Sequence, residues 1–500
     1  MTGKSHVLFA AGSNSAGQLG LGHLDDSHIW QRCTIDNEQS YHSFPAIGSR
    51  IVQLSSGAAH SVAILEDEEK GRQVWVCGSG ADGQLGPAHW RWYEEKEDDK
   101  MPLLTFTRLN IEDVLENSHH STDSSAWSPK SVECGWDWTL IVLEDIESKQ
   151  DDLLLVLGIN NDFLQLGYPR SKDAKTCSQI IDLRSLCVPK EQSGATRIQI
   201  GSIACGLRHT IVACSARSEM DSVQNQHWLL GWGASRHGQV GKVQTTNTSI
   251  SSRSKVALAC LPRVIKGWRS KRDGSVKGRG LAHLAAGKEH SVILIPHLWE
   301  INSSIDSCGF DQVEEEHGLF SFGSNRNQQC ALNALPSIEK VQWDRTDILG
   351  ATWNGTFLVL SDKTSINQIE LRCCGNNTKG QLGTGNAKPL HETESGPIHR
   401  LLIDDADHDR FALQSVQLAC GSEHVALLLV SHTSPPQARV IGWGWNEHGN
   451  LATNDEDDRH TPIQLWPPES ENLVDHPTFR YARPVNVWAG CGTTFIQVEL

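Results

Sequence analysis

Long hydrophobic runs are absent from this sequence. No stretch approaches the roughly 18 consecutive apolar residues expected of a membrane-spanning helix. The first residues, MTGKSHVLFAAGSNSAGQLG, contain only the short apolar run VLFAA, which is too short for a secretory signal peptide. The 14 cysteines include no C-x-x-C pair, so we expect reduced thiols rather than disulfides or a zinc site. We therefore expect a protein of the cytoplasm, and also of the nucleus, that is neither secreted nor bound to a membrane.

Basic residues are outnumbered by acidic ones. Lys and Arg total 44 against 60 Asp and Glu, which gives a formal net charge of −16. An acidic surface opposes non-specific binding to DNA and to anionic lipid, so we do not expect direct nucleic-acid binding. The sequence also lacks a P-loop, a dinucleotide-binding fingerprint, an H-E-x-x-H motif and a nucleophile elbow. We therefore expect no catalytic residue for covalent chemistry, no cofactor and no metal.

A glycine-rich phrase, of which GSNSAGQLG is the first copy, occurs seven times. The third copy has one extra residue, and the fifth and seventh have lost the final Gly. The copies begin at Gly12, Gly78, Gly158, Gly233, Gly323, Gly375 and Gly444.

A second phrase, of the type ACGxxHxxxLL, alternates strictly with the first and also occurs seven times. Its copies lie at 54–65, 132–143, 203–213, 284–294, 349–360, 418–429 and 487–498. Four copies have His three residues after the Gly, and the fifth copy has Thr352 in place of the Gly. Because these histidines recur once per unit, we expect them to lie too far apart to share a metal ion. We expect each of them instead to form a hydrogen bond with the backbone of the adjacent turn.

The mean repeat of about 70 residues is typical of propellers rather than helical repeats. Apolar stretches of β-branched and aromatic residues, bounded by Gly or Asn, predict about four strands per unit. We assign structural roles in the turns to the residues that recur. They are Gly12, Gly57, Gly78, Gly135, Gly206, Gly233, Gly287, Gly375, Gly421, Gly444, His60, His209, His290 and His424.

The two phrases resemble the regulator of chromosome condensation repeat, and the resemblance extends from about Val7 to Val498. It implies an all-β fold, a seven-bladed β-propeller of four-stranded blades. The segment His6–Ala11 resembles the last strand of a unit but stands first in the chain. We therefore expect it to pair with Thr494–Glu499 and close the ring, which leaves no open sheet edge between the first and last units.

A single propeller is expected over residues 6–500. We place its blades at about 24–80, 87–160, 168–235, 242–325, 331–376, 384–445 and 452–500 with 6–12. The GQLG loops and the ACGxxH turns are expected on one face, because loops alternate between the two faces of a four-stranded blade. Insertions at 88–101, 110–128, 263–279 and 296–318 are expected to be solvated loops.

Two segments are candidates for binding a partner. The stretch GWGWNEHGN carries Trp443, Trp445, Glu447 and His448, and aromatic residues at strand ends are enriched at interfaces. The insertion 263–279 carries seven basic residues and one acidic residue, with an aromatic among them. Its candidate contacts for a partner are Trp268, Arg269 and Arg272. For this segment the alternative is a basic loop with no binding role, whose removal leaves the fold intact.

The resemblance leaves two functions open. The segments Gly12–His23 and WNEHGN are similar to a fungal alpha-tubulin-suppressor type of propeller. That similarity implies a monomeric, non-catalytic scaffold that binds a small zinc-containing electron-carrier protein and serves diphthamide synthesis and modification of wobble uridines in tRNA. The alternative is the activity of the founding member of the family, guanine-nucleotide exchange on a Ran-like small GTPase. Fold alone does not decide between them.

Overall fold

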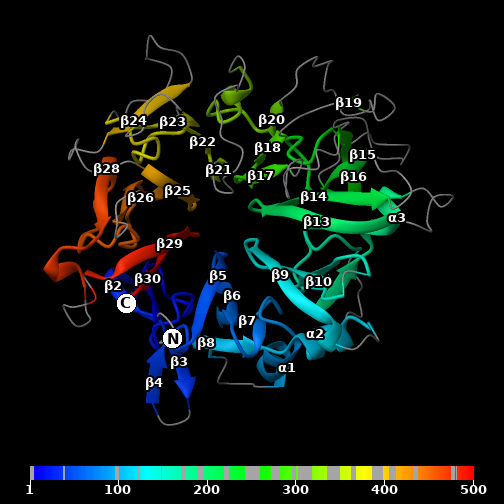
Figure 1. Ribbon diagram of the computed structural model, residues 1–500, viewed down its shortest axis with the longest axis horizontal. Coiled ribbons are helices and arrows are strands. Elements are labelled where there is room, and N and C mark those ends of the chain that lie inside the picture. Colours follow the sequence, from blue (N-terminus) through cyan, green and yellow to red (C-terminus); the bar gives the residue numbers. More distant parts are fainter. Residues whose placement is uncertain are drawn as a thin grey trace.

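Seven small sheets surround a central axis, as the face-on view of the computed structural model shows (Figure 1). This confirms the predicted seven-bladed propeller. The structure describes residues 5–37, 40–95, 101–120, 124–147, 149–169, 176–188, 196–218, 224–242, 259–271, 282–295, 300–301, 318–334, 349–361, 368–385, 398–404, 413–431, 437–473, 479 and 481–500.

Each blade is an antiparallel sheet whose strands follow one another from the axis outward. Blade 1 consists of β5 (Ser49–Ser56), β6 (His60–Asp67), β7 (Gly71–Gly78) and β8 (Leu103–Leu109). Blade 2 consists of β9 (Trp127–Cys134), β10 (Thr139–Asp145), β11 (Leu153–Leu157) and β12 (Ser178–Ile181). Blade 3 consists of β13 (Thr196–Cys205), β14 (His209–Ser218), β15 (Gln224–Ala234) and β16 (Ala259–Lys271), with β19 (Glu300–Ile301) beside β16.

Blades 4 to 7 continue the ring. The described strands of blade 4 are β17 (His283–Ala286), β18 (His290–Ile295) and β20 (Gly318–Gly323), and those of blade 5 are β21 (Leu349–Thr352), β22 (Gly355–Ser361), β23 (Gln368–Gly375) and β24 (His399–Asp404). Blade 6 consists of β25 (Leu413–Cys420), β26 (His424–Ser431), β27 (Ala438–Gly444) and β28 (Arg459–Trp466). Blade 7 consists of β29 (Arg483–Ala489), β30 (Thr493–Glu499), β1 (His6–Gly12) and β2 (Ser27–Arg32).

Both ends of the chain build blade 7. Strand β1 pairs with β30 from His6↔Glu499 to Gly12↔Thr493, which confirms the predicted closure. Strand β2 then pairs with β1, so the N-terminal part supplies two strands rather than one. In Figure 1 the red β29 and β30 accordingly lie beside the blue β2.

The predicted blade boundaries are offset by one strand from the observed sheets. The repeat order predicts that the strand after a GQLG loop begins a new unit, but wherever that strand is described it pairs with the strand before the loop, in the preceding sheet. Thus β8 pairs with β7 and β28 pairs with β27. A repeat fixes the order of strands but not the point at which one blade ends, and the outermost strand carries no repeated phrase that marks it.

The second strand of each blade is the most apolar, because neighbouring blades cover both of its faces. In β6, His60 to Leu65 are all buried, and so are all six residues of β18. Apolar clusters fill the space between successive blades around the whole ring. The core is therefore a set of layers between blades, and no boundary between blades lacks one.

Several predicted insertions are partly ordered. Segment 88–101 begins in helix α1 (Pro87–Glu95), and 110–128 contains helix α2 (Ile111–Asn117) and a short 3-10 helix (Ser124–Ala126). Val114 and Leu115 of α2 are buried between blades 1 and 2, so the expectation of a solvated loop is wrong there. Most of 296–318 lies outside the described residues.

Three further elements lie beside the blades. Strands β3 (Thr34–Asn37) and β4 (Ser40–Ser43) form a hairpin at the outer edge of blade 1, and helix α3 (Leu183–Cys187) lies between blades 2 and 3. Two more 3-10 helices are Ala331–Ala334 and Ser470–Asn472. No helix in the described part of the chain is long and apolar enough to cross a bilayer.

Candidate interaction face

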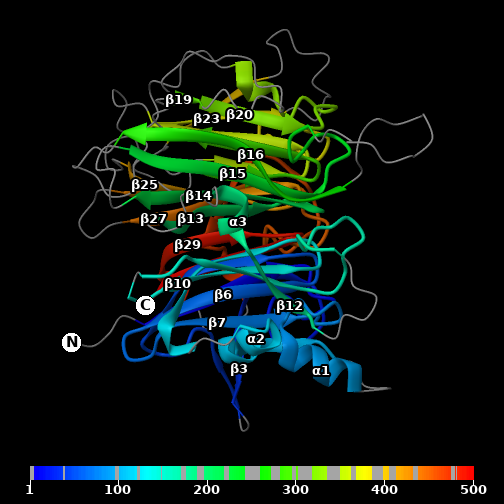
Figure 2. The same cartoon turned by 90° about the vertical axis from the view of Figure 1, so that its right-hand side faces the viewer.

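One face of the ring carries the GQLG loops and the turns between the first and second strands of the blades; we call it the loop face. Hydrogen bonds join the two kinds of loop directly. The Ser61 hydroxyl donates to the carbonyl of Gln18 at 2.7 Å, and the Thr139 hydroxyl donates to that of Gln84 at 2.8 Å. Strand β1 runs toward this face and β30 away from it, so the C-terminus, marked in Figure 2, lies on the opposite face.

Each of the four recurring histidines links its own blade to the next one. The Nε2 atom of His60 lies 3.0 Å from the Thr139 hydroxyl, and His209 and Ser291 repeat the contact at 2.9 Å. His290 to Thr356 and His424 to Thr494 do so at 3.1 and 2.9 Å. The partner is thus a side-chain hydroxyl of the adjacent turn. Since the Thr139 hydroxyl itself donates to Gln84, it accepts from the Nε2–H of a neutral histidine.

Burial keeps these imidazoles neutral. It lowers the pKa of His60, His290 and His424 to about 4, and that of His209 to about 3. They therefore act as fixed hydrogen-bond donors at neutral pH, not as proton shuttles.

The glycine of the ACGxxH turn is required by close approach. A Cβ atom at Gly57 would lie 2.4 Å from the carbonyl oxygen of Gly135 in the next blade and 2.6 Å from the His60 ring. Gly206 would meet the Gly287 oxygen in the same way, at 2.4 Å. Blade 5 solves the problem differently. Its Thr352 occupies the space left free because Gly355 replaces the histidine, with Thr352 Oγ1 2.8 Å from where a Gly355 Cβ would lie.

The residue after the turn glycine, or after Thr352 in blade 5, holds the equivalent position in each blade, and all of these residues except Lys288 line a cavity on the axis. These seven residues, which we call the axial ring, are Ala58, Trp136, Leu207, Lys288, Trp353, Ser422 and Cys491. Main-chain hydrogen bonds connect several neighbouring turns. The N–H of Lys288 donates to the carbonyl of Trp353, the N–H of Trp353 to the carbonyl of Ser422, and the N–H of Ser422 to the carbonyl of Gly490. The axial ring is therefore held by backbone, independently of its side chains.

Two tryptophans of the axial ring meet across the axis. Trp136 comes from blade 2 and Trp353 from blade 5, on the opposite side of the ring, yet their ring centroids are 5.8 Å apart. Trp136 is 38% exposed. The Nζ atom of Lys288, in blade 4, lies 5.6 Å from the centroid of the Trp353 ring. The centre of the loop face is thus aromatic and open to solvent.

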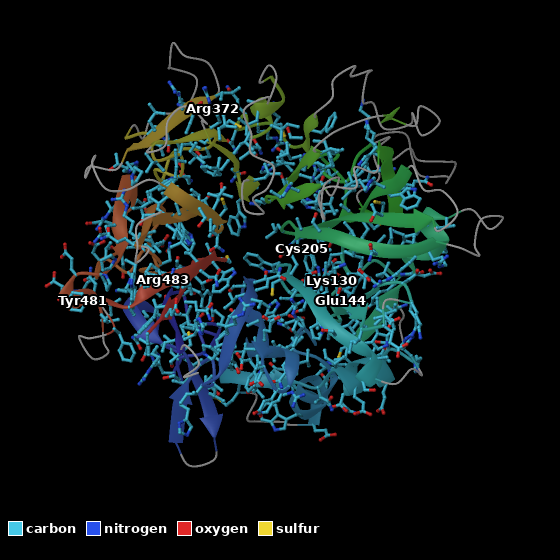
Figure 3. The ribbon with its side chains drawn as sticks, viewed as in Figure 1. Lys130, Glu144, Cys205, Arg372, Tyr481 and Arg483 are labelled. Atoms are coloured by element: carbon cyan, nitrogen blue, oxygen red, sulfur yellow. The ribbon has the colours of Figure 1, made fainter. Side chains whose placement is uncertain are left out.

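A cavity of about 310 Å³ lies on the axis, lined by the inner strands and turns of all seven blades. Its wall includes Glu133, whose pKa burial raises to about 8. Burial also raises the pKa of the lining thiols Cys134, Cys205 and Cys420, and that of Cys491 to about 11. Figure 3 shows Cys205 beside the axis. These thiols stay protonated and are poor nucleophiles.

Among the residues that the structure describes, no group of three or more His, Cys, Asp or Glu side chains is placed to hold a metal ion.

The structure separates the candidate partner residues of the GWGWNEHGN stretch. Trp443 is fully buried, and its indole N–H donates to Gln381 at 2.8 Å, so it packs between blades. Trp445 is partly exposed and lies edge-on to His448 at 5.2 Å, with its N–H donating to Glu447 at 3.0 Å. His448 lies 2.8 Å from Asp26 of the first GQLG loop. The three outer residues therefore form an ordered cluster where the ring closes.

The basic segment is not the loop that the sequence suggests. Residues 263–271 belong to β16, and Trp268 is 2% exposed and stacks on His227 at 5.4 Å. Deleting 263–279 would therefore remove most of β16, so we now expect that deletion to disrupt blade 3. Arg269 follows in the same strand, and Arg272 lies outside the described residues.

Sequence reasoning missed Trp136 and Trp353. The signal was available, because both follow the turn glycine position, in the second and fifth copies of the phrase. In a ring of seven, those copies lie on opposite sides. The residues that the copies share define the fold, whereas a binding surface lies in the positions at which the copies differ.

Comparisons with known proteins agree with this architecture. The secretion-regulating guanine nucleotide exchange factor of Mus musculus is 24% identical over 94% of this chain and 81% of its own length. An RCC1 repeat-containing protein of Schizosaccharomyces pombe is 23% identical over 99% of both chains. The crystal structure of Prp20p from Saccharomyces cerevisiae, described with its binding to Gsp1p and histones, superposes with a TM-score of 0.57 at 15% identity, covering 99% of this chain and 92% of that one.

No family model matches the chain. The repeat phrases, the closed ring of seven blades and relatives that span nearly the whole length together show that this chain belongs to the regulator of chromosome condensation repeat family.

Proposed function

We propose that this propeller is a guanine-nucleotide exchange factor that binds a small GTPase through its loop face. The observation that carries the proposal is the likeness to a protein named as an exchange factor over 94% of the chain. A second support is the solvent-open aromatic centre of the loop face.

The chemistry of exchange suits such a surface. An exchange factor accelerates nucleotide release when it binds the nucleotide-free GTPase more tightly than the nucleotide-bound form. This needs no nucleophile and no cofactor of its own. Exchange needs a rigid surface on the exchange factor, since ordering a mobile surface would consume part of the binding free energy. The hydrogen-bonded axial ring and the histidine links between blades supply that rigidity.

The scaffold for a small zinc-containing protein becomes the second hypothesis. None of the compared proteins described above is named for diphthamide synthesis or tRNA modification. A scaffold would need a protein-binding surface of the same kind, so the two proposals differ in the partner and not in the fold.

The test is release of fluorescent GDP from a panel of purified small GTPases, Ran-like members included, with and without the full chain. We expect release from at least one GTPase to be accelerated about tenfold or more, equivalent to about 1.4 kcal/mol in the barrier. That GTPase should be captured more strongly after its nucleotide is stripped with a chelator. No acceleration across the panel, together with chelator-insensitive capture of a small zinc-containing protein, would overturn exchange in favour of the scaffold.

A further inference from the structure

The axial ring differs in composition from the surface around it. Its side chains are two indoles, a leucine, an alanine, a cysteine, a serine and one lysine. The chain as a whole carries a net charge of −16, yet this central group holds no carboxylate. Exposed aromatic side chains at the centre of a face, surrounded by polar residues, are typical of the few residues that dominate binding energy at interfaces.

A purely structural role does not account for the Trp136–Trp353 contact. Neighbouring blades are already joined by apolar clusters around the ring and by the hydrogen bonds of the turns. Blades 2 and 5 are not neighbours, and the contact between them lies at the mouth of the axial cavity with Trp136 38% exposed. Large exposed indoles at such a point are costly to hydrate and available for contact.

Two cations lie over aromatic rings on the loop face, one of them at the indole pair. Lys288 lies over Trp353, and the exposed Arg208 lies over Phe163, 4.2 Å from its centroid. Within the described residues, neither has a carboxylate within 4.0 Å. Carboxylates also stand in the same turns. Glu289 lies 3.4 Å from His237, and burial raises the pKa of Asp137 and of Glu423. Lys288 and Arg208 are therefore the cations that this face offers to the carboxylates of a partner.

We propose that the axial ring anchors a segment of the partner protein in which an apolar side chain stands next to one or two carboxylates. The apolar side chain packs on the Trp136–Trp353 pair, and the carboxylates meet Lys288 and Arg208. Such pairs gain from partial exclusion of water by the surrounding loops. The inference rests on the proposed function only for the identity of the partner, and it holds for any protein bound at this face.

A peptide array tests the anchor without the GTPase. The probes are decapeptides with one Trp, Phe or Leu flanked by Asp and Glu, matched by peptides with Lys flanks. We expect the acidic series to bind the full chain, to quench tryptophan fluorescence and to weaken as salt is raised. Trp136→Ala and Trp353→Ala should each weaken binding about tenfold or more. Trp92→Ala is the matched control, because Trp92 in α1 is equally exposed, at 37%, but lies away from the axis.

Charge reversal keeps the proposal testable if an alanine variant fails to fold. Lys288→Glu should reduce binding of the acidic series and raise binding of the Lys-flanked series, with an unchanged melting temperature. Equal binding of both series, or equal losses in the axial variants and Trp92→Ala, would overturn the proposal. So would a dimer of this chain that dissociates in Trp136→Ala, because the occupant would then be a second copy. If the peptides bind as expected but no GTPase responds, the anchor stands and exchange fails.

Discussion

At the scale of single residues, four buried histidines make the protein sensitive to acid. Each folded-state pKa, about 3 or 4, lies below the 6.5 of an exposed histidine. Between those values the unfolded chain binds more protons than the folded one, so the free energy of unfolding falls as pH falls below 6.5. Each histidine contributes about 1.4 kcal/mol per pH unit. Urea unfolding at pH 7.5, 6.5 and 5.5 should show this loss, and His424→Gln should make it smaller. A flat profile across this range would contradict the buried neutral state.

Glu133 produces the opposite dependence. Its folded-state pKa is about 8 against a normal value of 4.5, so between these values the folded state holds a proton that the unfolded state has lost. Stability that is present below pH 4.5 is therefore lost as pH rises toward 8. Glu133→Gln should raise the free energy of unfolding at pH 8 by on the order of 3 kcal/mol and change it little at pH 5. The exposed Glu447→Gln serves as the control, and equal behaviour of the two variants would refute the assignment.

The fifth turn allows a test of coupled residues. Because Thr352 fills the space of the missing histidine, Gly355→His should destabilise the protein by about 1–3 kcal/mol through overpacking. Adding Thr352→Gly restores the pattern of the other turns and should recover part of the loss. A double-mutant cycle of melting temperatures measures this coupling. Strict additivity would show that the two positions do not share one space.

At the scale of secondary-structure elements, the strand that closes the ring is the most informative. Phe9 of β1 is fully buried, 5.3 Å from the ring of Trp466 in blade 6 and 5.7 Å from that of Phe479. Phe9→Ala should cost about 3–5 kcal/mol. Leu24→Ala, at a side chain 37% exposed, should stay within about 0.5 kcal/mol. Removal of residues 1–12 should abolish soluble folding, and a truncated chain with an unchanged melting temperature would refute closure by β1.

Elements with a repeated phrase could be predicted from the sequence, and those without one could not. The ACGxxH turns, the GQLG loops and the pairing of β1 with β30 follow from the order of the phrases. The sequence predicts loops at helix α2 and strand β16, because acidic, Ser-rich or basic composition outweighs short apolar signals such as Val114–Leu115 and Val264–Ile265. The offset of the blades has the same origin, because the outermost strands carry no phrase of their own.

At the scale of the whole molecule, the fold was far more predictable than the site. Seven copies of a phrase are enough to specify a ring, but a partner is recognised by what differs between copies. Trp443 matched a plausible pattern and proved to be buried, whereas the exposed Trp136 and Trp353 meet only because the ring places blades 2 and 5 opposite each other. Trp445 and His448 remain candidates for binding a partner at the edge of the same face, where His448 contacts Asp26.

The most direct measurement of the account is the rate of GDP release from the responding GTPase, compared for the native chain, the Trp136→Ala/Trp353→Ala variant and Trp92→Ala. We expect rapid release with the native chain and with Trp92→Ala. We expect a loss of about tenfold or more with the axial variant, at an unchanged melting temperature. Equal rates with all three proteins would show that the centre of the loop face does not act on the GTPase, and no release with any of them would contradict the exchange activity itself.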